Sequence, residues 1–133
     1  MSDEKLPKEV IDFIADHIDS ALQLEILLLL HKHPERHWTA GEIDTQLRIN
    51  REWVAEQLAV LSRQRLLQLT QGNAGPSYQY APADPALASA VAGLAKWHST
   101  HRVAIVNMIY SKPTKHLRSF ADAFRIRKDP PNG

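Results

Sequence analysis

The chain contains no cysteine, which excludes disulfide bonds, thiolate metal sites and cysteine nucleophiles. It also lacks a long hydrophobic run. The longest apolar stretch, Ile26 to Leu30, is far shorter than the roughly 18 residues that a membrane-spanning helix needs. The N-terminal segment MSDEKLPKEV is acidic and polar, without the apolar core of a signal peptide. We therefore expect a soluble, cytoplasmic protein that does not contact membranes.

Catalytic motifs are missing as well. The sequence contains no glycine-rich phosphate loop, no G-x-S-x-G and no H-E-x-x-H. The carboxylate pairs Asp16/Asp19 and Glu52/Glu56 fit solvated helix surfaces better than an acid–base site. The sequence thus predicts neither an enzyme nor a cofactor.

What is present is enough for one buried core, because 44% of the 133 residues are apolar and 23% are charged. The net charge of +1 conceals a gradient along the chain. Residues 1–33 hold three Lys/Arg and seven Asp/Glu, whereas residues 96–133 hold eight Lys/Arg and two Asp/Glu. Affinity for nucleic acid or for an acidic partner is therefore expected near the C-terminus.

Apolar residues at spacings of three and four predict helices in the first third of the chain. We expect an N-terminal helix within residues 1–19 and a second helix that starts after Ser20, a candidate N-cap, and ends at Pro34. The run Ile26 to Leu30 is apolar on nearly all sides, so this second helix should be central.

Residues 38–69 predict two further helices joined by a tight connection. Thr39 and Glu42 have the spacing of a capping box at the start of a short helix. Asn50 can cap a longer helix from Arg51 to about Arg65, whose buried face includes Val54, Leu58 and Leu61. A short helix, a tight turn and an amphipathic helix are typical of the helix-turn-helix motif.

The pattern then changes to alternation around the segment QGNAGPS, which predicts a β-hairpin with a longer loop. Asp84 and Pro85 have the residue types of an N-cap and first helical position. One long helix is expected over residues 84–111, because Pro113 would break it. Residues 112–133 form a basic amphipathic tail.

This order of elements resembles the winged helix-turn-helix domain of bacterial transcriptional regulators. Apolar residues stand where that family keeps its core positions, namely Ile43, Leu47, Ile49, Val54, Leu58, Leu61 and Leu67. The likeness covers residues 20–83, and the flanking helices are similar to the dimerising extensions of MarR-like and PadR-like regulators. It implies a mainly α fold with some β structure, and a homodimer that binds double-stranded DNA.

In such regulators the second helix of the motif enters the major groove. Exposed residues of its N-terminal half would then read bases, and nearby arginines would contact the backbone. The candidates are Arg48, Asn50, Arg51, Trp53, Gln57, Arg63 and Arg65. Trp53 could instead pack against the N-terminal helix.

Two features favour a different partner. Glu52 and Glu56 would repel phosphate, and no Lys or Arg lies between Leu66 and Ala83, where the hairpin of a DNA-binding winged helix usually carries one. A protein-interaction adaptor without DNA binding is therefore the alternative.

The long C-terminal helix has apolar and histidine residues at heptad spacing, which predicts a helix–helix seam. The seam would join two copies of the chain, or the helix would fold back on its own domain. Its members are Leu87, Val91, Leu94, His98, His101, Ile105 and Met108.

Seven histidines raise the question of a metal site. The segment HKHPERH spans a proline, and His98 and His101 fit the helix seam, so we expect no metal ligands. The tail interleaves basic residues with Leu117, Phe120 and Phe124. It could be a nucleic-acid arm, a docking segment for another protein, or a clasp across a dimer.

Overall fold

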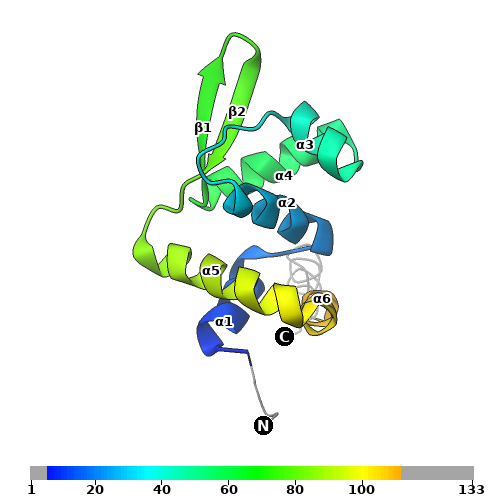
Figure 1. The fold of residues 1–133 in the computed structure, drawn as a ribbon, viewed down its shortest axis with the longest axis vertical. Coiled ribbons are helices and arrows are strands. Elements are labelled where there is room, and N and C mark those ends of the chain that lie inside the picture. Colours follow the sequence, from blue (N-terminus) through cyan, green and yellow to red (C-terminus); the bar gives the residue numbers. More distant parts are fainter. Residues whose placement is uncertain (1–5, 112–133) are drawn as a thin grey trace, which may run out of the picture.

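The computed structural model describes residues 6–111, whose arrangement is drawn in Figure 1. The described residues form six helices and two strands. These are α1 (Lys8–His17), α2 (Ala21–Lys32), α3 (Ala40–Leu47), α4 (Arg51–Arg63), β1 (Leu67–Gly72), β2 (Gly75–Tyr80), α5 (Pro85–Thr100) and α6 (Arg102–Ser111). The mainly helical architecture with a small antiparallel sheet is confirmed. The predicted tail, residues 112–133, lies outside the described residues.

The N-cap residues expected from the sequence begin four of the helices. Ser20, Asn50 and Asp84 each accept a hydrogen bond from the backbone N–H three residues further on, at 2.9–3.0 Å. Thr39 and Glu42 form the complete capping box, with bonds of 3.0 and 3.1 Å. Each bond satisfies a backbone donor that the first turn of a helix leaves free.

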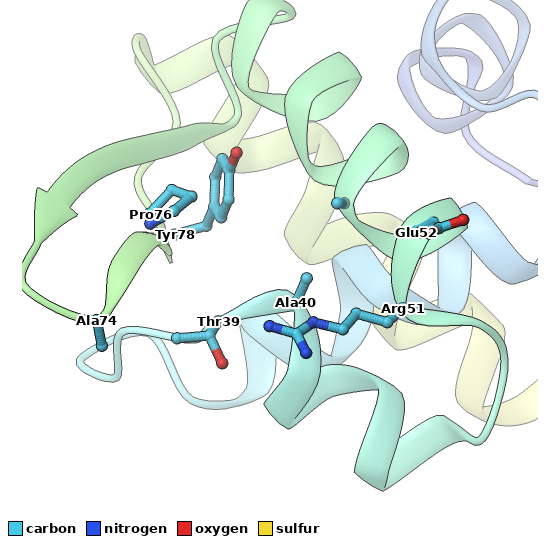
Figure 2. Close-up of a pocket in the computed structure, with 8 residues that line it drawn as sticks. Thr39, Ala40, Arg51, Glu52, Ala74, Pro76 and Tyr78 are labelled. Atoms are coloured by element: carbon cyan, nitrogen blue, oxygen red, sulfur yellow. The ribbon is translucent and has the colours of Figure 1, made fainter.

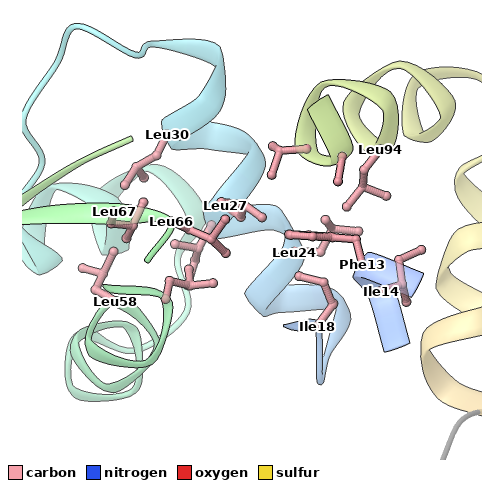
Figure 3. Packing of buried hydrophobic residues seen from close by; sticks show 14 of the residues in the cluster. Phe13, Ile14, Ile18, Leu24, Leu27, Leu30, Leu58, Leu66, Leu67 and Leu94 are labelled. Atoms are coloured by element: carbon pink, nitrogen blue, oxygen red, sulfur yellow. The ribbon is translucent and has the colours of Figure 1, made fainter. Parts of the chain in front are cut away.

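The central helix of the core is α2. Its buried face carries Leu24, Leu27 and Leu30, and Figure 3 shows these side chains between two groups. On one side lie residues of α4 and the hairpin base, among them Leu58 and Leu66. On the other side lie residues of α1 and α5, including Phe13, Ile14 and Leu94. The predicted central position of this helix is confirmed.

The β-hairpin is more regular than expected. Its strands pair from Leu67↔Tyr80 to Gly72↔Gly75, so only two residues remain in the turn in place of the predicted longer loop. Gly75 has a φ of 106°, a conformation that side chains with a Cβ rarely adopt. Trp38 exchanges two backbone hydrogen bonds with Tyr78, at 2.7 and 2.8 Å, so the segment before α3 lies beside β2.

The prediction of a single helix over residues 84–111 is wrong, because the helix is interrupted at one residue between α5 and α6. His101 leaves the helical conformation, with φ −131° and ψ 46°. The hydroxyls of Ser99 and Thr100 donate to the carbonyls of Lys96 and Trp97, at 2.7 and 3.4 Å. Such local bonds weaken helices, and the β-branched Thr100 is itself a poor helix former.

Candidate nucleic-acid interface

The candidate interface lies beside the hairpin. Figure 1 shows the hairpin projecting from one end of the molecule, with α3 and α4 next to it and α1, α5 and α6 at the other end. The connection from α3 to α4 is tight because Arg48 adopts a left-handed conformation, with φ 55°. Ile49 packs against the core and Asn50 caps α4. The arrangement is a short helix, a tight turn and an amphipathic helix.

The most exposed face of α4 is acidic in its first half. Val54, Leu58 and Leu61 are fully buried. Since successive helix residues are about 100° apart, the opposite face is made by Glu52, Glu56 and Arg63, all of them exposed. The carboxylates of Glu52 and Glu56 thus face outward, as the sequence indicated. The exposed face of α4 is therefore not uniformly basic.

Arg51 lies at the edge of a cleft between α4, the start of α3 and the hairpin. The cleft has a volume of about 380 Å³ and is lined by Thr39, Ala40, Arg51, Glu52, Ala55, Ala74, Pro76 and Tyr78. Figure 2 shows the side chain of Arg51 extending toward Thr39, whereas the carboxylate of Glu52 points the other way. Within residues 6–111, no carboxylate forms an ion pair with Arg51. Its charge is available to an anion.

Three further arginines lie at the two ends of α4. Arg48 is exposed on the turn before the helix. Arg63 and Arg65 are exposed at its far end, near the base of the hairpin. Arg65 has a φ of 69°, and its carbonyl accepts a hydrogen bond from the N–H of Ala83. Because α4 is 13 residues long, the two basic ends are separated by about 18 Å.

Three of the expected base-reading residues have structural contacts instead. The Gln57 Oε1 atom accepts a 2.8 Å hydrogen bond from Gln23, so Gln57 faces α2. Trp53 is half-buried against the core. Asn50 is exposed, but its Oδ1 atom is occupied by the backbone N–H of Trp53. Gln57 lies on the inner edge of α4, where a polar side chain needs a partner, and its bond to Gln23 supplies one. That Gln57 reads DNA stays a prediction.

Arg36 also belongs to this surface, although the sequence does not predict it. Its guanidinium carbon lies 3.6 Å from the centre of the Trp38 ring, and it forms a 3.8 Å ion pair with Glu42. Both contacts place Arg36 beside the start of α3. The only signal in the sequence was an arginine two residues before a tryptophan, which no helical or strand periodicity makes specific.

The apolar residues expected to form a dimer seam pack within their own chain. Val91, Leu94 and Ile105 are fully buried, so they cannot contact a second copy in this conformation. Leu87 and Met108 are partly buried against the same core. The helices α1 and α5 approach closely, since a Cβ atom added at Gly93 would lie 3.1 Å from Val10. The apolar heptad positions are therefore filled by the chain's own N-terminal helix and core.

The two histidines of that seam also have partners in the chain. The Nε2 atom of His98 lies 3.9 Å from Glu25, and the ring of His101 packs 4.6 Å from that of Trp97. His98 thus faces α2, and His101 marks the break between α5 and α6. Both rings are partly buried by contacts within their own chain.

The other histidines within residues 6–111 do not gather into a metal site. Within residues 6–111, no group of three or more histidines and carboxylates is arranged to hold a metal ion. His31 packs edge-on against Tyr80, with ring centres 5.1 Å apart. Partial burial lowers the pKa of His31 and raises the pKa of Tyr80 to about 12.

The chain matches none of the protein-family models, curated proteins or solved structures with which it was compared. In the described part of the chain, no helix is both long enough and apolar enough to cross a membrane.

Proposed function

We propose that residues 20–83 form a winged helix-turn-helix domain that binds double-stranded DNA, and that the protein is a cytoplasmic transcriptional regulator. The order helix, helix, tight turn, helix and hairpin supports this proposal. The antiparallel bridge between Trp38 and Tyr78 also supports it, because it places the segment before α3 beside β2 as a short third strand-like segment. In this interpretation α4 is the helix that enters the major groove and the hairpin is the wing.

The observation that carries the proposal is the guanidinium of Arg51, which forms no ion pair within residues 6–111. It lies at the N-terminal end of α4, in a cleft shared with the hairpin and with the first turn of α3. Backbone N–H groups at a helix start attract anions. A DNA phosphate or a guanine edge would therefore find a cation and helix donors together.

The acidic face of α4 restricts how DNA could bind. Glu52 and Glu56 disfavour close contact with phosphate, so backbone contacts fall to the arginines at the two ends of the helix. A carboxylate in the major groove can accept a hydrogen bond from the exocyclic amine of cytosine. Arg51 can contact guanine and Glu52 can contact cytosine, so each of them favours G·C pairs at its own position.

The first test is the substitution Arg51→Ala. We expect it to weaken specific DNA binding by about 1–3 kcal/mol, because it removes one charged contact. Fluorescence anisotropy with a bound duplex would measure the loss. Lys96→Ala is the matched control, since Lys96 is an exposed cation on α5, at the other end of the molecule. Equal affinities of the Arg51→Ala variant and the wild type would remove Arg51 from the interface.

A protein-interaction adaptor remains the second candidate function. It is favoured by the two carboxylates on the exposed face of α4 and by the absence of Lys and Arg from residues 66–83. In that case the cleft beside Arg51 would accept an acidic side chain of a protein. No DNA binding by the wild-type chain even at low salt would favour this function.

A further inference from the structure

The hairpin carries no cation of its own, because β1, β2 and the turn between them contain no Lys or Arg. The segment between α2 and α3 does carry one, and Figure 1 shows this segment passing beside the hairpin. Trp38 forms a bridge to Tyr78 of β2, and the side-chain amide of Gln79 donates a 3.1 Å hydrogen bond to the carbonyl of Pro34. Contacts on both sides of Arg36 therefore hold it close to β2.

The guanidinium of Arg36 rests on the ring of Trp38. Its central carbon lies 3.6 Å from the ring centre, so the cation covers one face of the indole. The Trp38 side chain is only 1% exposed and is therefore a fixed support, whereas Arg36 is exposed. A guanidinium carries five N–H donors around its edge. A group covered on one face can thus still bind two oxygens of a phosphate.

Glu42 forms an ion pair with Arg36, and this pair is loose. The Nη2 atom of Arg36 lies 3.8 Å from the Oε1 atom of Glu42, which is beyond hydrogen-bonding distance. The same oxygen already accepts a 3.0 Å hydrogen bond from the backbone N–H of Thr39 in the capping box. The carboxylate is therefore held at the start of α3, where it attracts the guanidinium without occupying its donors.

We propose that Arg36 binds a phosphate of the DNA backbone beside the hairpin, and that Glu42 restrains this contact. The inference rests on the proposed DNA-binding function. When the hairpin lies against DNA, Arg36 approaches the same stretch of backbone and supplies the charge that the hairpin lacks. The stack on Trp38 orients the guanidinium before DNA arrives, which reduces the entropy lost on binding. Glu42 competes with the phosphate for the same cation.

The salt dependence of binding tests this contact without a known target sequence, because each neutralised phosphate contributes about 0.9 to the slope of log K against log salt. We expect Arg36→Gln to make the slope about 0.9 shallower and to lower the affinity about tenfold at about 50 mM salt. The matched control is Arg102→Gln on α6, at an exposed arginine that also pairs with a carboxylate, Glu25, at 3.3 Å. This control should bind DNA like the wild type.

Glu42→Gln tests the restraint with the opposite sign. Glutamine also serves at this position of a capping box, so the substitution keeps the helix start and removes the charge that attracts Arg36. We expect DNA binding to become about two- to fivefold tighter, which is the worth of an exposed ion pair. In an Arg36→Gln background this gain should be nearly lost. An equal gain in both backgrounds would overturn the proposal.

Arg36→Lys separates the charge from its orientation. We expect the slope of the wild type with about two- to fivefold weaker binding, because lysine lacks the planar group that covers the ring of Trp38. A wild type that binds DNA beside an Arg36→Gln variant of unchanged slope would overturn this inference and leave the proposed function standing. A wild type that does not bind DNA at low salt would overturn both.

Discussion

Gln23 is the one polar side chain buried among the core residues of the described chain, with 1% of it exposed. Its two amide atoms are both satisfied. The oxygen accepts from the backbone N–H of Asp19 at 2.8 Å, and the nitrogen donates to Gln57 at 2.8 Å. This pair ties the start of α2 to the middle of α4, and it fixes which edge of α4 faces inward.

The first prediction concerns this pair. We expect Gln57→Ala to lower the free energy of unfolding by about 1–3 kcal/mol, because it leaves a buried donor of Gln23 without a partner. Urea denaturation would measure the loss. DNA affinity should stay within about twofold of wild type, since a direct base contact would carry more than 1 kcal/mol.

The matched variant replaces both glutamines. Gln23→Leu combined with Gln57→Leu removes the donor and the acceptor of this bond together, but it also removes the acceptor of the Asp19 N–H. The double variant should therefore recover only part of the lost stability. A Gln57→Ala protein of unchanged stability but sharply weaker DNA binding would restore Gln57 to the reading surface and contradict the structural role.

At the scale of the elements, the packing of α5 decides where a second copy can bind. Leu94 is fully buried between α5 and the rest of the core, close to Phe13 and Ile14 in Figure 3. A substitution there acts on folding, because the side chain already has its partners within the chain.

We therefore expect Leu94→Ala to lower the free energy of unfolding by about 2–5 kcal/mol. The oligomeric state, compared at equal protein concentration below the unfolding transition, should not change. Urea denaturation and sedimentation equilibrium together check both statements. Leu69→Ala is the control, and we expect its loss to stay below about 1 kcal/mol, because Leu69 is 43% exposed. Dissociation of a dimer by Leu94→Ala at unchanged stability would return the interface to α5.

The helix starts could be predicted from the sequence because capping is local. Ser20, the Thr39–Glu42 box, Asn50 and Asp84 each act within three residues of their own position. The buried face of α4 could be predicted for a similar reason, since it follows from a period of 3.6 residues.

The partners of the C-terminal helices could not be predicted in the same way. A heptad pattern indicates that a face is covered, but it does not indicate whether α1 or a second chain covers it. The break at His101 depends on hydroxyl contacts of Ser99 and Thr100, which compete with a strong apolar pattern on both sides. The exposure of Val103 and Tyr110 could not be predicted either, because it depends on which face of α6 is buried, and that face is the one with Ile105 and Ile109.

For the molecule as a whole, the groups proposed to contact DNA lie at one end. The hairpin, the cleft of Arg51 and the segment that carries Arg36 are at this end, and α6 with its exposed Val103 and Tyr110 is at the other (Figure 1). A partner bound to α6 would leave the cleft open. Substitutions in α6 should therefore leave DNA binding intact.

The central claim is that the protein binds DNA through arginines at the ends of α4. The most direct measurement is the anisotropy of labelled duplex DNA titrated with the intact wild-type chain at several salt concentrations. Three phosphate contacts per chain, from Arg48, Arg63 and Arg65, predict a slope of log K against log salt of about −2.7 or steeper. No binding at low salt, or an affinity that does not change with salt, would contradict the account and favour a protein partner.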